Sequence, residues 1–187
     1  MKKLLITIFA QTLMISVILL TGNRAGADDE SLPVPFVRAS ANGHFYFKMI
    51  PESPLDREKG HGICYQVLSE AGDEVLWQTS GWYSNRVYLT HDGQYLVRYG
   101  NWPRGHELSE NHLAIAFYHR GQLIRSYSTK QLVKDPAQIL PSMSHYYWSR
   151  RDPEFDTFRY LFKLKTIDNV EYTFDIKSGN IITEQQL

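Results

Sequence analysis

The sequence predicts an all-β protein, an antiparallel β-meander of about three propeller-blade-like repeats with little helix. Short aromatic and β-branched runs alternate with turn residues, and 24 of the 25 aromatic residues follow position 27. Tyr, Phe and Trp are typical of pleated, half-buried strands. Two segments also recur about fifty positions apart. A sandwich-like packing of the same strands is the alternative arrangement.

Strands are expected where an apolar run lies between Gly, Asn or Asp residues. Five turns offer a residue that tolerates a positive φ, which indicates antiparallel hairpins. They are Asn42-Gly43, Asp92-Gly93, Arg120-Gly121, Asp168-Asn169 and Ser178-Gly179. The expected strands lie near 36–40, 43–50, 62–69, 74–79, 85–90, 94–99, 113–119, 122–128, 158–166, 170–176 and 180–184. Helix is expected only within 129–140, where Pro136 limits it to short turns.

The repeat is the strongest sign of organisation. Its two matches pair residues 41–49 with 91–99 and residues 71–77 with 120–126. A weaker third copy is predicted within 144–184. A period near fifty that is made of short strands is typical of propeller blades. Because closed propellers usually have at least four blades, we expect a single-chain meander, with completion by oligomerisation as the alternative.

The best-defined part of the repeat carries a resemblance. It contains, in order, His91-Asp92-Gly93-Gln94-Tyr95-Leu96-Val97, then Asn101-Trp102 in a polar loop, then Leu113-Ala114-Ile115-Ala116-Phe117-Tyr118 and Gly121-Gln122-Leu123-Ile124-Arg125-Ser126-Tyr127. This segment resembles uncharacterised exported bacterial proteins with propeller-like, blade-type β-repeats. The likeness is best over 85–128 and loose over 36–184. It implies a fold and brings no catalytic residues with it.

The first 27 residues are typical of a secretory signal peptide. Lys2 and Lys3 precede an apolar run over 4–20, and Ala25-Gly26-Ala27 forms a small-x-small cleavage site. An uncleaved membrane anchor is the alternative for a run of this length. We expect cleavage after Ala27, export to the periplasm or the extracellular space, and no stable membrane insertion afterwards.

The remaining residues, 28–187, are expected to form a single β-rich domain. The whole chain has a formal net charge of zero, and without the leader it is slightly acidic, at −3. This balance favours neither nucleic acid nor an anionic membrane as a partner. Cys64 is the only cysteine, so no internal disulfide is expected. Its strand-like surroundings favour a small buried side chain over a nucleophile.

A long polar loop over 100–112 joins two expected strands where a tight turn would be enough. Long loops in compact domains are often functional. His106 and His112 with Glu107 or Glu110 could offer ligands to zinc, with His119 or His91 as a third ligand, but their spacing matches no zinc motif. We therefore expect a solvated loop that Trp102 pins to the core, with no metal and no cofactor.

The sequence contains no complete catalytic set. G-x-S-x-G and a glycine-rich phosphate loop are absent. Carboxylate pairs for glycoside cleavage could be drawn from Asp92, Glu107, Glu110 or Asp156, but any chain of this size offers such pairs. No catalytic residue is predicted. The sequence leaves enzymatic activity uncertain and favours a protein that is not an enzyme.

Two clusters combine aromatic residues with arginine, at 82–86 and 144–151. Such mixtures are typical of recognition surfaces, although core tryptophans beneath an arginine stem are an equally good interpretation. The sequence favours a non-catalytic exported domain that binds an envelope or extracellular protein or ligand. A small exported metal-dependent hydrolase centred on 100–112 is the alternative. The candidate binding residues are Trp82, Tyr83, Arg86, Asn101, Trp102, Arg104, His106, His112, Tyr147, Trp148 and Arg150.

Overall fold

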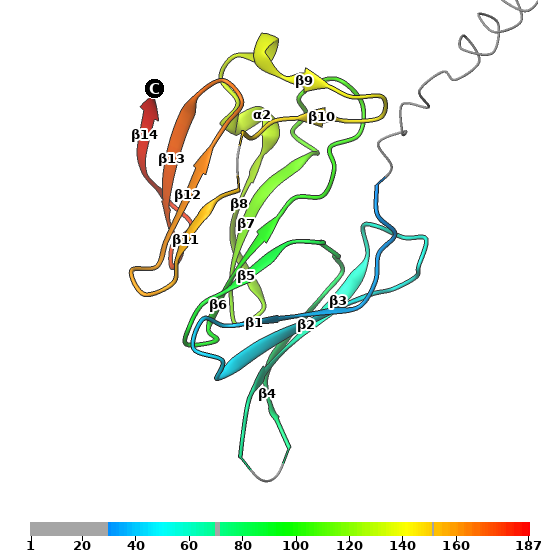
Figure 1. The fold of residues 1–187 in the computed structure, drawn as a ribbon, viewed down its shortest axis with the longest axis vertical. Coiled ribbons are helices and arrows are strands. Elements are labelled where there is room, and N and C mark those ends of the chain that lie inside the picture. The colour runs from blue at the N-terminus through cyan, green and yellow to red at the C-terminus, as the bar shows by residue number, and fades with distance from the viewer. Residues whose placement is uncertain (1–29, 70–71, 151) are drawn as a thin grey trace, which may run out of the picture.

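The computed structural model describes residues 30–69, 72–150 and 152–187, so the expected signal peptide at 1–27 lies outside the described residues. The described part forms three four-stranded antiparallel sheets and one two-stranded hairpin. In each large sheet, neighbouring strands are also consecutive in sequence, which makes each sheet a meander (Figure 1). We call these sheets blades 1, 2 and 3. The predicted all-β fold of three blade-like repeats is confirmed.

The strands have these bounds. Blade 1 contains β1 (Phe36–Ala39), β2 (Phe45–Pro51), β3 (Gly60–Gln66) and β4 (Glu74–Ser80). Blade 2 contains β5 (Val87–Leu89), β6 (Tyr95–Tyr99), β7 (Leu113–His119) and β8 (Gln122–Ser128). Blade 3 contains β11 (Glu154–Asp156), β12 (Leu161–Lys165), β13 (Val170–Asp175) and β14 (Ile181–Gln186). The hairpin contains β9 (Leu140–Pro141) and β10 (Tyr146–Tyr147).

The main differences from the expected elements lie between blades 2 and 3. Among the residues that the structure describes, helix is confined to α2 (Thr129–Leu132) and the 3₁₀ turn Pro136–Gln138, as Pro136 predicts. Strands β9, β10 and β11 are too short to show a period in the sequence. The strand expected at 158–166 is shorter in the structure, where β12 covers Leu161–Lys165 and follows a turn over 157–160. No helix in the described ranges has the length and apolarity needed to cross a bilayer.

The predicted repeat corresponds to a shared turn in blades 1 and 2. Between β1 and β2, the Ser40 hydroxyl donates to Asn42 Oδ1 at 2.8 Å. Between β5 and β6, the Thr90 hydroxyl donates to Asp92 Oδ1 at 2.6 Å. The glycines that follow, Gly43 and Gly93, have φ values of 72° and 67°, which side chains rarely adopt. The fifty-residue period therefore encodes one hairpin geometry twice.

The same turns connect each blade to the next. In blade 1, Asn42 Nδ2 donates to the His91 carbonyl of blade 2 at 2.8 Å. In blade 2, Asp92 Oδ2 accepts from the Tyr160 hydroxyl of blade 3 at 2.8 Å. Burial raises the pKa of Asp92, but hydrogen bonds from Thr90 and from the backbone of Gln94 outweigh this effect and lower it. The turn geometry that blades 1 and 2 share thus stabilises the contacts between successive blades.

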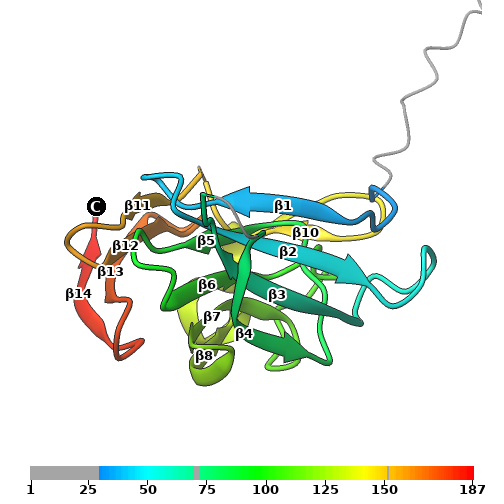
Figure 2. The same cartoon turned by 90° about the horizontal axis from the view of Figure 1, so that it is seen from below.

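Two apolar clusters lie on opposite faces of blade 2. The first joins blades 1 and 2, and its buried members include Phe47, Met49, Cys64, Trp77, Leu96, Ala116 and Tyr118. The second joins blades 2 and 3, and its buried members include Val97, Ile115, Phe117, Phe162, Tyr172 and Phe174. Successive residues of β7 point to opposite faces, so five of its seven residues are buried. Blade 2 lies between its neighbours (Figure 2).

Truncation of Phe117 should strongly destabilise the protein. Its ring is fully buried on β7 and packs against Phe162 and Phe174 of blade 3. We expect Phe117→Ala to lower the free energy of unfolding by about 3–5 kcal/mol in urea titrations. The control is Phe158→Ala, because the Phe158 side chain is 69% exposed. Similar losses in both variants would contradict this packing.

Candidate functional site

A cavity of about 430 Å³ opens where three separate segments of the chain meet. The segments are 85–86 after blade 1, 99–103 from the end of β6, and 145–150 with Asp152, between the hairpin and blade 3. We call this cavity the aromatic cavity. It is lined by Asn85, Arg86, Tyr99, Gly100, Asn101, Trp102, Pro103, His145, Tyr146, Tyr147, Trp148, Ser149, Arg150 and Asp152.

Backbone hydrogen bonds fix the hairpin β9–β10 against the loop over 100–112. The Tyr146 N–H donates to the Pro103 carbonyl at 3.3 Å, and the Gly105 N–H donates to the Ser144 carbonyl at 3.0 Å. Arg104 and His145 also form an antiparallel bridge. The hairpin and this loop lie side by side in Figure 1. The long loop is therefore structured, and it forms one wall of the cavity.

One aromatic stack runs along this wall. The Trp102 and His145 rings stack with centroids 3.9 Å apart, and His145 meets Tyr147 edge to face at 4.8 Å. His145 is only 2% exposed, whereas Tyr147 is 46% exposed. The stack holds the exposed Tyr147 ring next to the buried His145 ring.

A second stack combines a guanidinium with two rings. The Arg86 guanidinium lies 4.7 Å from the centre of the Tyr99 ring, and Tyr99 stacks on Trp148 at 5.2 Å. The hydroxyls of Tyr99 and Ser149 are 2.6 Å apart. Burial raises the pKa of Tyr99 to about 12. Tyr99 is therefore an uncharged structural group around neutral pH. The cation–π contact with its ring positions Arg86.

The rim of the cavity carries an excess of positive charge. Arg86 Nη1 lies 2.9 Å from Asp152 Oδ1, so these two charges compensate each other. Arg150 Nε donates to the Ile167 carbonyl at 3.0 Å, and the Arg150 N–H donates to the Lys165 carbonyl at 3.0 Å. No carboxylate within the described ranges forms an ion pair with Arg150. Among the described residues that line the cavity, Arg150 therefore carries a positive charge without an ion-pair partner.

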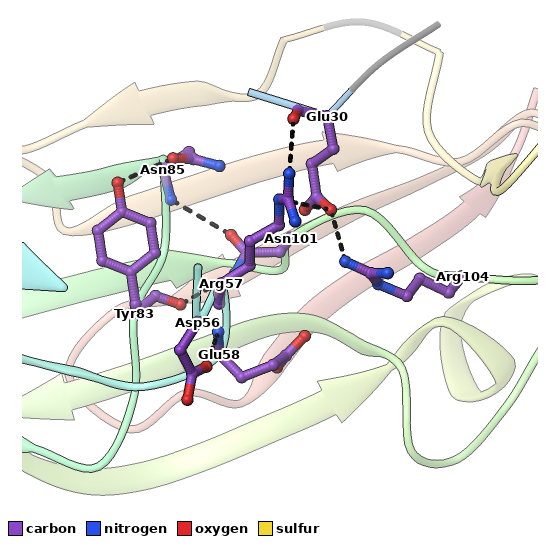
Figure 3. A network of polar contacts seen from close by, with 8 residues as sticks. All are labelled: Glu30, Asp56, Arg57, Glu58, Tyr83, Asn85, Asn101 and Arg104. Carbon is purple, nitrogen blue, oxygen red and sulfur yellow. Dashed lines mark hydrogen bonds and ion pairs between the residues drawn. The ribbon is translucent and has the colours of Figure 1, made fainter. Parts of the chain in front are cut away.

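Asn101 cross-links the loops beneath the cavity (Figure 3). Its Nδ2 donates to the carbonyls of Arg57 at 2.8 Å and Tyr83 at 3.0 Å. Its Oδ1 accepts from the Asn85 N–H at 3.2 Å. One amide thus satisfies backbone groups of two other loops, at 52–59 and 81–86.

Glu30 extends this network toward the start of the described chain. Glu30 Oε2 lies 3.3 Å from Arg57 Nε and 2.9 Å from Arg104 Nη2 (Figure 3). The Glu30 side chain is only 11% exposed, whereas that of Arg104 is 64% exposed. The N-terminal segment is therefore fastened beside the cavity, and Arg104 contributes to that attachment.

Six of the eleven predicted binding residues line the aromatic cavity. They are Arg86, Asn101, Trp102, Tyr147, Trp148 and Arg150. Trp82 and Tyr83 instead belong to the core between blades 1 and 2, where they are 6% and 0% exposed. The Arg98 guanidinium covers Trp82 at 4.7 Å, so the core interpretation of tryptophan beneath arginine applies there. The remaining three, Arg104, His106 and His112, lie outside the cavity lining.

The two histidines of the 100–112 loop have separate partners. His106 Nε2 lies 3.0 Å from the Ser142 carbonyl oxygen, and His112 Nδ1 lies 2.9 Å from the Tyr146 hydroxyl. Within residues 30–69, 72–150 and 152–187, no group of three or more metal-ligating side chains comes together. The structure therefore does not assemble the ligand set that the hydrolase alternative requires.

A second hollow of about 480 Å³ is lined by residues 106–108 of this loop, His106 included, and by side chains of the segment 130–139. Leu108, Val133, Pro136 and Ile139 give it an apolar lining. The nearby Lys134 is ion-paired with Glu184, with Nζ and Oε1 3.1 Å apart. This hollow has no aromatic stack and lacks an equivalent of the Asn101 network.

Cys64 is buried on β3, as expected. Its Sγ lies 3.6 Å from the Gly93 carbonyl, to which the Trp77 indole also donates at 2.7 Å. Burial, with a further contribution from Asp92, raises the pKa of the Cys64 thiol to about 12. The thiol is therefore protonated at neutral pH and packs as a small apolar side chain.

Sequence reasoning missed several residues of the cavity. His145, Ser149 and Asp152 lie within or next to the predicted cluster at 144–151 and could have been included with it. Tyr99 and Tyr146 lie in strands and read as core residues, so only the spatial arrangement places them at the cavity.

No family model matches this sequence, and no curated protein matches it. Solved structures with a similar arrangement of strands include the C-terminal WD40 domain of Sif2 and Sqt1 of Saccharomyces cerevisiae. For the Sif2 domain, the TM-score is 0.35 at 12% identity, over 85% of this chain and 39% of that chain. For Sqt1, the TM-score is 0.32 at 10% identity, over 81% and 50%. The chain thus spans half or less of the length of these two structures.

Removal of the Asn101 amide should loosen the floor of the cavity. Asn101→Ala leaves two carbonyls and one N–H without their partners, so we expect the free energy of unfolding to fall by about 2–3 kcal/mol. Chemical denaturation measures this loss. The control is Asn111→Ala in the same loop, because Asn111 is exposed and only its backbone N–H is seen to bond. Equal stability of the two variants would show that the network does not hold the loops.

Proposed function

We propose that this protein is a non-catalytic binding module that holds an extracellular or envelope ligand, or part of a protein partner, in the aromatic cavity. The observation that carries this proposal is the convergence of three distant segments on one cavity of about 430 Å³. Ligand pockets typically have volumes of roughly 300–1,000 Å³ and combine apolar walls with a few placed polar groups. The aromatic stacks and the two arginines match that description.

The cavity is also preorganised for binding. Asn101, the β9–β10 hairpin and the stacked rings fix its walls through contacts within the protein. The conformational entropy of these walls is already lost when the protein folds. A ligand does not have to order them, which favours affinity. Arginine and tyrosine at such positions are typical of residues that contribute strongly to binding.

The protonation states of Arg86, Arg150 and Tyr99 favour binding over proton transfer. The arginines are always charged, and the pKa of Tyr99 lies far above neutral pH. A general acid or base works best when its pKa is near the working pH. Side chains with a fixed protonation state hold and orient a ligand.

The export signal belongs to the same proposal. A cleaved leader at 1–27 would place the cavity in the periplasm or the extracellular space. We expect the protein recovered from that compartment to begin at Asp28, which an intact-mass measurement would detect. A protein that retains residues 1–27 in the cytoplasm would contradict this part of the proposal.

The cavity can be tested with small organic fragments before its ligand is known. In a fragment screen followed by protein NMR, we expect hits to shift the indole N–H signals of Trp102 and Trp148. Tyr147→Ala should abolish or weaken these hits on the order of tenfold, because the exposed ring is lost. The control, Phe158→Ala, removes a 69% exposed ring from the turn before β12, outside the cavity lining. Hits confined to the hollow beside Val133, or insensitive to Tyr147→Ala, would contradict the proposed site.

A further inference from the structure

We propose that the aromatic cavity binds a sugar ring that carries a single carboxylate, as in a uronic acid. This inference rests on the proposed function of the cavity and adds the chemical class of its ligand. The carboxylate would contact Arg150, and the ring would lie against Tyr147.

The charge of the rim points to a singly charged anion. Among the described residues that line the cavity, Arg86 and Arg150 contribute two positive charges and Asp152 one negative charge. These three side chains leave an excess of one positive charge when histidine is counted as neutral. A sugar carboxylate carries one negative charge, whereas a phosphate monoester carries about 1.5–2 at neutral pH. The Asp152 carboxylate repels the additional charge of a phosphate. The rim is therefore better matched to a carboxylate.

The geometry of Arg150 suits a carboxylate. Its Nε and its backbone N–H are both committed to carbonyls next to blade 3. These bonds orient the guanidinium and leave its two terminal nitrogens for a ligand. A guanidinium presents paired N–H donors that match the two oxygens of a carboxylate. Arg86 cannot play this part as readily, since Asp152 and the Tyr99 ring already hold it.

The neighbours of Arg150 favour a ring with hydroxyl groups. Tyr147 is the most exposed ring of the cavity and offers an apolar surface for the C–H groups of a sugar. The Asp152 carboxylate can accept hydrogen bonds from hydroxyls, and its side chain is 86% exposed. Asn85 is also exposed at this rim, so its amide adds a donor. These groups are all side chains, which suits the hydroxyls of a sugar. An extended peptide would typically pair its backbone with a free strand edge.

Three forms of one sugar test the charge of the ligand. Galacturonic acid, its methyl ester and galactose 6-phosphate share a ring but differ in charge. N-acetyltryptophan serves as a probe for a peptide terminus. Calorimetry and indole N–H shifts measure binding of each to the full chain. We expect galacturonic acid to bind with a dissociation constant at least on the order of tenfold below those of the ester and the phosphate.

Two variants and one control link the preference for the carboxylate to named residues. Arg150→Met keeps an unbranched apolar stem and removes the guanidinium. It should reduce the affinity for galacturonic acid to that for its ester. Arg159→Met removes the same charge from an 80% exposed side chain in blade 3 and should change nothing. Asp152→Asn should narrow the preference for the carboxylate over the phosphate, because it removes the repelling charge. Near-native urea midpoints for all three variants separate loss of binding from loss of fold.

The possible outcomes distinguish the ligand class from the site. Equal binding of acid and ester, stronger binding of the phosphate, or binding of N-acetyltryptophan alone at the same indoles would overturn the carboxylated sugar and leave the cavity as a binding site. The absence of galacturonic acid binding in the millimolar range would also overturn it. If the fragment screen then also finds no hit at this cavity, the proposed function falls as well.

Discussion

The burial of blade 2 on both faces is the constraint on which the rest of the structure depends. A β-strand presents alternate side chains to opposite faces, and β7 uses this alternation to contribute Ala116 to one apolar cluster and Phe117 to the other. Blade 1 shares one of these clusters with this central sheet, and blade 3 shares the other, which also includes Leu132, Val133, Tyr146 and Trp148. Cys64 is the only cysteine and is free, so no internal disulfide joins the blades. The packing of the three sheets therefore depends on these clusters and on the turn contacts between blades.

The binding cavity follows from how the central blade is connected. Strands β6 and β7 pair in register, but the chain between them makes the long excursion over 100–112. That excursion passes beneath the β9–β10 hairpin, and the hairpin in turn leads into blade 3. The cavity therefore lies where the connections of all three blades meet. Asn101 fixes these connections to one another, because its amide bonds to two carbonyls and one N–H from other loops.

Much of the fold could be predicted because strands leave a period of two in the sequence. In β13, for example, Val170, Tyr172 and Phe174 are buried and alternate with half-buried residues. The hairpin β9–β10 leaves no such period, since each strand has two residues and β10 is held by the distant Pro103. Part of the site was predictable from composition, as Tyr147, Trp148 and Arg150 show. Composition could not separate them from Trp82 and Tyr83, because the core placement of that pair depends on how blades 1 and 2 pack.

Hydrogen exchange of the native protein tests the central claim most directly. If blade 2 is the shared core, the backbone amides of β6 and β7 should exchange last, at a free energy equal to that of global unfolding. The amides of β1 and β14, at the free edges of blades 1 and 3, should exchange earlier. Exchange of β7 at a lower free energy than blade 1 or blade 3 would contradict the account. It would mean that an outer blade is stable without the central sheet.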